Sequence, residues 1–416
     1  MRYELYKLLK NRLLFVGIIL SVVLTFYQSY ERGKYLTYRY DSYSEKYSEE
    51  VKNELNGKFE LWALRYKLTK KNGANSVFPD EMYERAGYTK EEAVSFTDGE
   101  RQGIFDWFEY YLILSGRADS CQAGIDYRKK VVRNADRLRK TADTYQRRTN
   151  EKLFKMYADD VDYVVSDQRL SDDFRTQWYD KAYSDYINIM LVLLAVCIEF
   201  LTEHRNNTFQ MVYSSYEGRG KTYIRKVMVI AGFTTLLSLV TTLLMHMRLF
   251  TDARAGEFLK MDFRNYYIHS PYKMNFLQFI VDIWLLRLLG YLVLSMFFTM
   301  LAVLSKKSLL PFVAGVSAGC GGYELFDRLL HRLGMLRMNN GDARNVYHTC
   351  ELVRKYTPFG VIRQGIDYLT EYEPNNILGC PITTLTIAVV VSICYILLFL
   401  VAGCIIYLKR FRKKGV

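Results

Sequence analysis

The sequence lacks the motifs by which most enzymes are recognised. Only five of its 416 residues are histidines, and HExxH, GxSxG and a GxGxxG following a strand are all absent. These absences argue against zinc metalloproteases, α/β-hydrolases and dinucleotide-binding enzymes. The fragment 220–222 (Gly-Lys-Thr) looks like the end of a phosphate-binding loop, but Ser215 stands where that loop needs glycine. We therefore predict that the chain does not itself hydrolyse ATP and holds neither cofactor nor metal.

Cysteine is also scarce, and its spacing indicates no metal or redox motif. There are seven cysteines and no CxxC pair, so no zinc site is expected. Four of them fall in apolar stretches, where a thiol behaves as a small hydrophobe: Cys197, Cys320, Cys394 and Cys404. The other three are Cys121, Cys350 and Cys380, and a disulfide between the last two is an alternative that the sequence leaves open.

The chain carries a net charge of +13, and the excess is concentrated in four short segments. Residues 1–12, 203–226, 305–308 and 409–416 together hold 16 Lys and Arg against 3 Asp and Glu, which is again +13. These segments alternate with apolar stretches in the pattern of the positive-inside rule. They are scattered rather than clustered with aromatics on one soluble face, so we exclude nucleic acid as a partner. The charge predicts that both termini lie in the cytoplasm.

Six apolar stretches can supply membrane spans. They are 13–28, 186–201, 227–247, 276–304, 309–323 and 382–408. A bilayer core about 30 Å thick needs about 20 apolar helical residues, and 227–247 and 382–408 meet that requirement without a charge. The 309–323 stretch is short and rich in glycine, so it is either a complete span or a partly re-entrant helix. The first stretch can be interpreted as a cleavable signal, but no small-x-small cleavage site follows it, which favours an anchor.

About 155 residues, 30–185, separate the first two spans and suffice for a domain. Apolar residues recur there every three or four positions, which predicts amphipathic helices. One series runs from Tyr47 to Tyr66 and the other from Val131 to Met156. We expect two long helices packed against each other. The aromatic cluster at 105–111 is interpreted as core packing, with a ligand platform as the alternative.

The segment between the second and third spans carries an ordered set of polar residues. In chain order they are Glu203, Asn207-Thr208, Ser214-Ser215, Gly218-Arg219 and Lys226, with the short apolar run 209–213 between them. This order resembles the hallmark of type-2 ABC exporter permeases, in which glycine usually stands at the position of Asn207. The first residues, 3–10, are similar to the amphipathic elbow helix that begins such permeases.

The resemblance implies a membrane-spanning subunit that works with a separate ATP-binding-cassette ATPase subunit. It also implies a dimer with a second copy or a paralogous permease, in a bacterial plasma membrane. Residues 209–216 would form a coupling helix seated on the ATPase subunit, with apolar anchors and rim charges typical of an interface. The implied coupling residues are Glu203, Arg205, Thr208, Phe209, Tyr213 and Arg219. The alternative is an interfacial helix that only holds the membrane level.

Two ionisable residues, Asp282 and Arg287, stand within the fourth stretch and are candidates for an intramembrane polar site. They are five positions apart and so point to different helix faces, which makes a direct pair between them doubtful. They can instead contact other helices, or the segment can enter the bilayer only after Arg287.

The sequence therefore predicts an all-α polytopic membrane protein with six transmembrane helices and a large helical extracytoplasmic domain between the first and second. The expected divisions are 1–29, 30–185, 186–323, 324–381 and 382–416. The loop 324–381 is expected to stay outside, either as re-entrant helices near 356–362 or as a helical cap. The predicted function is export as an ABC permease by alternating access. The alternative is a non-transporting membrane sensor or binding protein acting through its external domain.

Overall fold

Long apolar helices make up most of the described chain. The computed structural model describes residues 2–40, 122–140, 143–159, 161, 182–205, 218–251, 255–267, 269–305, 309–317, 328–329, 332, 354–363 and 365–412. Within these residues, five helices are long and apolar enough to cross a membrane. They are α2 (Arg12–Tyr40), α10 (Ala182–Arg205), α12 (Gly218–Thr251), α14 (Phe276–Leu304) and α20 (Thr384–Arg412). The chain is thus a mostly helical protein with the composition of a multi-pass membrane protein.

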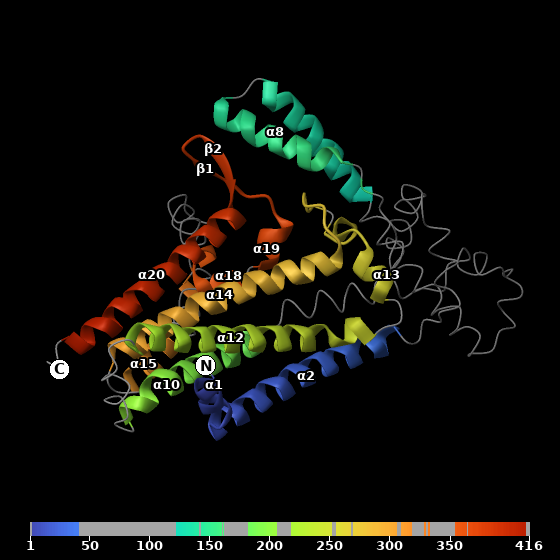
Figure 1. Cartoon of the computed structure of the whole chain (residues 1–416). Helices are drawn as coiled ribbons and strands as arrows, with labels where there is room; N and C mark the ends of the chain where they lie inside the picture. Colours follow the sequence, from blue (N-terminus) through green and yellow to red (C-terminus); the bar gives the residue numbers. More distant parts are fainter. Residues whose placement is uncertain are drawn as a thin grey trace, which may run out of the picture.

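Shorter elements lie at the two ends of this bundle, and one of them, α18, packs alongside α14 (Figure 1). They are α1 (Arg2–Leu9), α8 (Thr144–Ala158), α13 (Ala255–Lys260), a 3-10 turn (Phe263–Asn265), α15 (Leu309–Val316), α18 (Pro358–Arg363), α19 (Gly365–Thr370), β1 (Pro374–Ile377) and β2 (Cys380–Thr383). A further helix spans residues 122–140. The strands pair antiparallel, from Pro374 opposite Thr383 to Ile377 opposite Cys380. The sequence pattern does not predict this β-hairpin.

Side-chain contacts give the direction of each long helix. Ser21 of α2 bonds Asn188 of α10, and Ser29 bonds the carbonyl of Met245 in α12. Contacts of α10 with α12, α14 and α20, and of α14 with α20, complete the set. They show that α2 and α12 run one way while α10, α14 and α20 run the other. We call the end where α2 begins and α20 finishes the basal end, and the opposite end the hairpin end (Figure 1).

Two neighbouring helices, α14 and α20, run parallel. The rings of Phe297 and Phe399 lie 5.3 Å apart, and Ala388 near the start of α20 packs in the same cluster as Phe276 at the start of α14. Because both helices start at the hairpin end, the chain between them returns from the basal end to the hairpin end.

The apolar stretch 309–323 lies within this returning part of the chain. Its described portion is α15, which has 8 residues and is therefore about 12 Å long, much shorter than a span. Gly315 of α15 packs against α10 and α14, where an added Cβ would lie 2.8 Å from Leu193 and 3.3 Å from Phe298. Residues 318–323 lie outside the described part of the chain.

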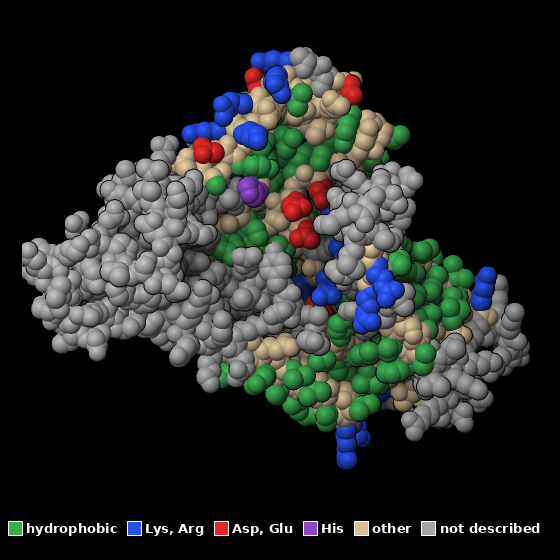
Figure 2. All heavy atoms as spheres, turned by 180° about the vertical axis from the view of Figure 1, so that it is seen from behind, with side chains coloured by type: hydrophobic (Ala, Val, Ile, Leu, Met, Phe, Trp, Pro, Cys, Tyr) green, Lys and Arg blue, Asp and Glu red, His purple; other side chains and the backbone are tan. Residues whose placement is uncertain are grey.

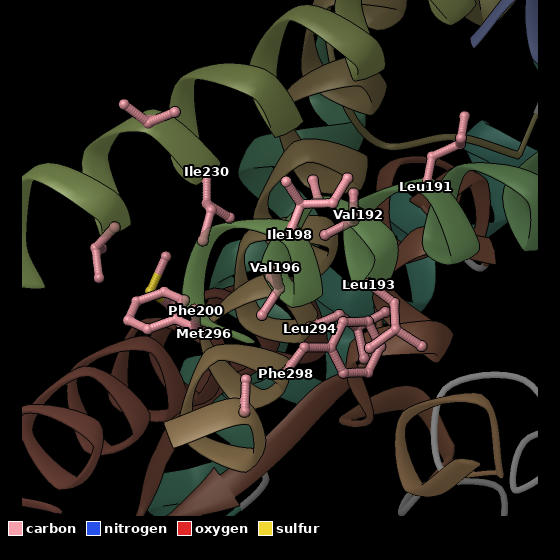
Figure 3. Packing of buried hydrophobic residues seen from close by; sticks show 14 of the residues in the cluster. Leu191, Val192, Leu193, Val196, Ile198, Phe200, Ile230, Leu294, Met296 and Phe298 are labelled. Atoms are coloured by element: carbon pink, nitrogen blue, oxygen red, sulfur yellow. The ribbon is translucent and has the colours of Figure 1, made fainter. Parts of the chain in front are cut away.

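Helices α10 and α14 form the centre of the bundle. In both, 67% of the apolar window is buried within the protein, against 22% for α2 and 11% for α20. Figure 3 shows the packing around α10, where Leu193, Val196 and Phe200 meet side chains of α12 and α14 such as Ile230 and Phe298. The more exposed apolar faces of α2 and α20 are those expected of helices that contact lipid.

Polar side chains mark where several helices start. The side chain of Asn11 accepts a hydrogen bond from the backbone N–H of Leu14 at 3.1 Å, which separates α1 from α2. Asn275 caps α14 in the same way through Gln278 N–H at 2.7 Å. Such caps satisfy backbone donors that the first helical turn leaves free.

The region predicted as re-entrant helices or an external cap packs along α14. An added Cβ at Gly290 would lie 2.6 Å from Ile362 and 2.7 Å from the carbonyl oxygen of Pro358, so only glycine lets α18 come this close. Gly290 is 14 residues into α14, or about 21 Å from its start. Helix α18 therefore lies halfway along α14 rather than on its end.

The described part of the predicted external domain is helical, but the prediction of one continuous helix over 131–156 is wrong. The 122–140 helix ends before Asp143, which caps α8 by accepting from Gln146 N–H at 2.8 Å. The 122–140 helix and α8 then pack together, with the rings of Tyr127 and Tyr157 6.0 Å apart. We call this pair the helical hairpin. Residues 47–66 and 105–111 lie outside the described residues.

Candidate functional site

A cluster of buried polar side chains joins four of the long helices near the hairpin end. It consists of Ser21, Asp185, Asn188, Thr241, Arg287 and Tyr291, which we call the central polar cluster. Its core is an ion pair between Asp185 of α10 and Arg287 of α14. The side chains of both residues are at most 3% exposed. A buried charge is tolerated only when paired and hydrogen-bonded, so this pair fixes how α10 lies against α14.

Neighbouring side chains extend the hydrogen bonding of the cluster. The Tyr291 hydroxyl donates to Asp185 Oδ1 at 2.7 Å. Asn188 donates to the hydroxyls of Thr241 and Tyr291 at 3.4 and 3.5 Å, and its Oδ1 accepts from Ser21 at 3.0 Å. One side chain from α10 thus contacts α2, α12 and α14 together. Within a bilayer there is no hydrophobic driving force between helices, because lipid tails are as apolar as the helix surfaces. Hydrogen bonds between side chains of different helices then stabilise their association.

A second charged cluster lies at the basal end, between α1, α10 and α12. It consists of Glu4, Lys7, Glu199 and Lys226, which we call the basal charge cluster. Lys7 Nζ lies 2.7 Å from the Glu4 carboxylate and 3.7 Å from that of Glu199. Lys226 Nζ donates to the backbone carbonyl of Glu199 at 2.9 Å and lies 5.3 Å from the centre of the Phe200 ring.

Burial makes the basal charge cluster more than a surface ion pair. The side chain of Glu199 is fully buried, and Lys226 is 1% exposed. Burial alone would raise the pKa of Glu4, but the Lys7 ammonium bonded to it holds that pKa below its usual value. The cluster therefore ties α1 to the last turns of α10 and the first turns of α12, the two helices that flank residues 206–217.

The helical hairpin is fastened to the bundle by a buried arginine. Arg128 is 5% exposed and donates to the carbonyls of Ser270, Met156 and Asp159 at 3.3, 3.2 and 3.2 Å. Its guanidinium also lies 4.9 Å from the centre of the Tyr157 ring, and the Tyr157 hydroxyl donates to the carbonyl of His269 at 2.7 Å. Burial raises the pKa of Tyr157, so this hydroxyl keeps its proton.

Helix α8 also contacts the β-hairpin that leads into α20. Tyr145 donates to the carbonyl of Pro374 at 3.2 Å, Arg148 to that of Gly379 at 3.1 Å and Lys152 to that of Pro381 at 2.7 Å. The helical hairpin is therefore attached to the segments immediately before α14 and α20.

The predicted coupling residues fall only partly within the described structure. Glu203 and Arg205 belong to the last turn of α10 and Arg219 to the first turn of α12, but their side chains are not described. The remaining three, Thr208, Phe209 and Tyr213, lie outside the described residues.

The two predicted intramembrane residues have different surroundings. Arg287 is buried against Asp185, whereas Asp282 is partly exposed on the same helix. The two do not pair with each other, as their spacing indicated. Of the cysteines, Cys380 has an exposed thiol 3.3 Å from an Arg148 nitrogen, while Cys350 lies outside the described residues.

Sequence reasoning missed Asp185, Asn188, Tyr291 and the role of Glu4 and Lys7. The sequence pattern places Asp185 only as the last residue of the predicted external domain. A usable signal existed, since Asp185 and Arg287 both stand at or within apolar stretches and have opposite charge. Such isolated charges are expected to pair. Within the described residues, no three His, Cys, Asp or Glu side chains come together as a metal site would need.

No family model, curated protein or solved structure matches the chain. A functional assignment therefore depends on the sequence pattern and on the geometry of the two clusters.

Proposed function

We propose that the chain is the permease subunit of an ABC exporter, which moves its substrate by alternating access and is powered by a separate ATPase subunit. The observation that carries the proposal is the basal charge cluster. It joins the elbow-like helix α1 to α10 and α12, the two helices that carry the ends of the permease-like motif, residues 203–226. Lys226, the last residue of that motif, is itself one of the buried members.

The cluster gives the coupling segment a mechanical connection to the spans. A force applied to residues 203–226 reaches α10 and α12 directly through the chain. Lys226 bonds the Glu199 carbonyl and Lys7 approaches the Glu199 carboxylate. We therefore expect a movement of one of the ends of α10, α12 and α1 to be passed to the other two. In the proposed cycle, ATP-driven approach of two ATPase subunits brings two such segments together and opens a path between the two permease copies.

The parallel arrangement of α14 and α20 supports the six-span topology in this proposal. Both helices start at the hairpin end, so the chain from Ser305 to Thr383 crosses the thickness of the bundle once more. Helix α15 starts at the basal end and begins that crossing. With six crossings, both termini lie on one side, which the positive-inside rule assigns to the cytoplasm of a bacterial plasma membrane.

The first test asks whether an ATP-binding-cassette protein is captured with the full-length chain from its native membrane in mild detergent. The second asks whether that partner's ATPase activity responds to the permease. We expect Arg219→Glu to abolish the response and leave membrane insertion intact. Lys409→Glu makes the same charge reversal at an exposed basal position of α20 and is the matched control. Normal coupling in R219E, or coupling lost equally in both variants, would contradict the assignment.

A second candidate function follows from the attachment of the helical hairpin. The helical hairpin bonds to the segments before α14 and α20. A ligand bound to the helical hairpin could therefore shift the arrangement of the spans without any transport. The chain would then be a membrane sensor. Absence of an ATPase partner, both in the native complex and in the genes beside this one, would favour the sensor over the exporter.

A further inference from the structure

The tip of the β-hairpin is an apolar turn that is exposed among the residues the structure describes. Leu378 is 98% exposed and its neighbour Ile377 is 40% exposed. Leu378 and Gly379 form the two-residue turn, with φ of +52° and +77°. Two positive φ values define the tight hairpin turns that favour Asn-Gly. A leucine at a positive φ is uncommon. The turn therefore carries two unfavourable features, a disfavoured backbone conformation at Leu378 and an apolar side chain exposed to water.

The helical hairpin, whose α8 contacts the β-hairpin, is basic. Residues 122–159 hold 11 Lys and Arg against 5 Asp and Glu, a net charge of +6. In the first turns of α8, Arg148 bonds the Gly379 carbonyl beside Leu378, and the adjacent Arg147 is exposed. Figure 2 shows Lys and Arg side chains gathered along the edge of the molecule formed by the helical hairpin, on the side away from the spans.

The tip also stands next to the start of a span. Strand β2 ends at Thr383 and α20 begins at Thr384, which is also where its apolar window starts. In Figure 1 the β-hairpin turns sideways off the end of α20, on the side facing away from α12 and α2. Only 11% of the apolar window of α20 is buried within the protein, so the β-hairpin adjoins a helix that has most of its apolar surface free to contact lipid.

We propose that the β-hairpin tip and the first turns of α8 form a membrane-surface contact that binds the anionic phospholipid headgroups of the leaflet where α20 begins. Leu378 and Ile377 enter the boundary between headgroups and acyl chains, and Arg147 lies among the phosphates. Apolar side chains flanked by cationic ones are the usual composition of interfacial membrane contacts. The contact removes the exposed leucine from water. It also anchors the helical hairpin to the bilayer, because the helical hairpin bonds both the β-hairpin and the loop before α14.

Tryptophan fluorescence of the full-length protein in vesicles tests this contact. Leu378→Trp and Ile377→Trp place the probe at the tip, and the signal of the four native tryptophans is subtracted using the parent protein. We expect quenching by phospholipids brominated near the headgroup and protection from aqueous acrylamide. The control is Ala123→Trp, an exposed position at the far end of the helical hairpin, which should be quenched by acrylamide only.

Charge dependence is tested by comparing vesicles of phosphatidylcholine with vesicles that also contain phosphatidylglycerol. Anionic lipid should strengthen lipid quenching of the L378W probe. Arg147→Glu should remove that gain, whereas Lys129→Glu, an equal charge reversal at an exposed position near the anchored end, should keep it. Tip probes quenched like A123W would overturn the proposal, as would lipid quenching that is the same in both kinds of vesicle. Binding of soluble polyphosphate without lipid quenching would assign the basic residues to a soluble polyanion and also overturn it.

Discussion

The buried ion pair between Asp185 and Arg287 gives a prediction whose size can be worked out from the structure. Asp185→Asn keeps the shape of the side chain but leaves the guanidinium of Arg287 without its counter-charge at a site that is 3% exposed. Breaking a buried pair by removing one partner costs about 3–5 kcal/mol. We therefore expect D185N to lower the free energy of unfolding by about that amount.

The reciprocal variant and the double variant together measure the coupling energy between Asp185 and Arg287. Arg287→Met should also cost about 3–5 kcal/mol, because it strands the Asp185 carboxylate. The double variant D185N/R287M removes both charges of this pair, and replacement of a buried pair by neutral residues is often close to neutral. The double variant should therefore be more stable than either single variant, with a coupling energy of several kcal/mol.

The measurement is a denaturing-detergent titration in lipid–detergent micelles, monitored by tryptophan fluorescence. Trp284 lies about one helical turn before Arg287 and reports locally. Asp282→Asn is the matched control, since it makes the same substitution at a partly exposed position of α14 and should change stability by about 0.5 kcal/mol or less. The reasoning would be refuted if each single variant lowered the free energy of unfolding by less than about 1 kcal/mol and the two effects added in the double variant. That result would show that the pair is not desolvated.

Three further predictions concern packing, attachment and the tip. Gly290→Ala should lower the free energy of unfolding by about 1–3 kcal/mol, because the new Cβ clashes with α18. Gly232→Ala places its Cβ where no atom lies within 4 Å, so in thermal unfolding it should be neutral or stabilising. Arg128→Gln removes charged donors to three carbonyls, each worth about 1.5–3 kcal/mol, so limited proteolysis should cleave the helical hairpin faster while the spans stay protected. Leu378→Asn supplies a residue that the turn prefers, so vesicle-bound protein should keep a folded β-hairpin but lose its protection from aqueous probes at the tip.

The long apolar helices were the most predictable part of the fold. The stretch predicted at 276–304 coincides with α14, and 227–247 lies inside α12. Hydropathy locates such helices because a span must satisfy every backbone group internally and expose apolar side chains to lipid. The same signal was weaker at 309–323, where glycine and a neighbouring cluster of charges interrupt it, and the described helix there is only α15.

Contacts between distant residues could not be predicted from one sequence. Asp185 and Arg287 are 102 positions apart, and no local pattern says which span faces which. The division of 131–156 into two helices did have a local signal, because Asp143 is a good N-cap residue. The four-and-three spacing on both sides of Asp143 concealed it, since two helices can continue one apolar period across a short turn.

Helix α10 connects the two polar clusters. It carries Asp185 and Asn188 at the hairpin end and Glu199 at the basal end, and 14 residues between Asp185 and Glu199 correspond to about 21 Å of helix. Since 67% of its apolar window is buried among the other helices, α10 cannot move at one end without disturbing its neighbours at the other. A displacement of the basal charge cluster therefore reaches Arg287 of α14, and through α14 the segments that hold the helical hairpin. If α10 transmits force in this way, D185N should weaken the response of the partner ATPase even though Asp185 lies at the end of the bundle opposite the coupling segment.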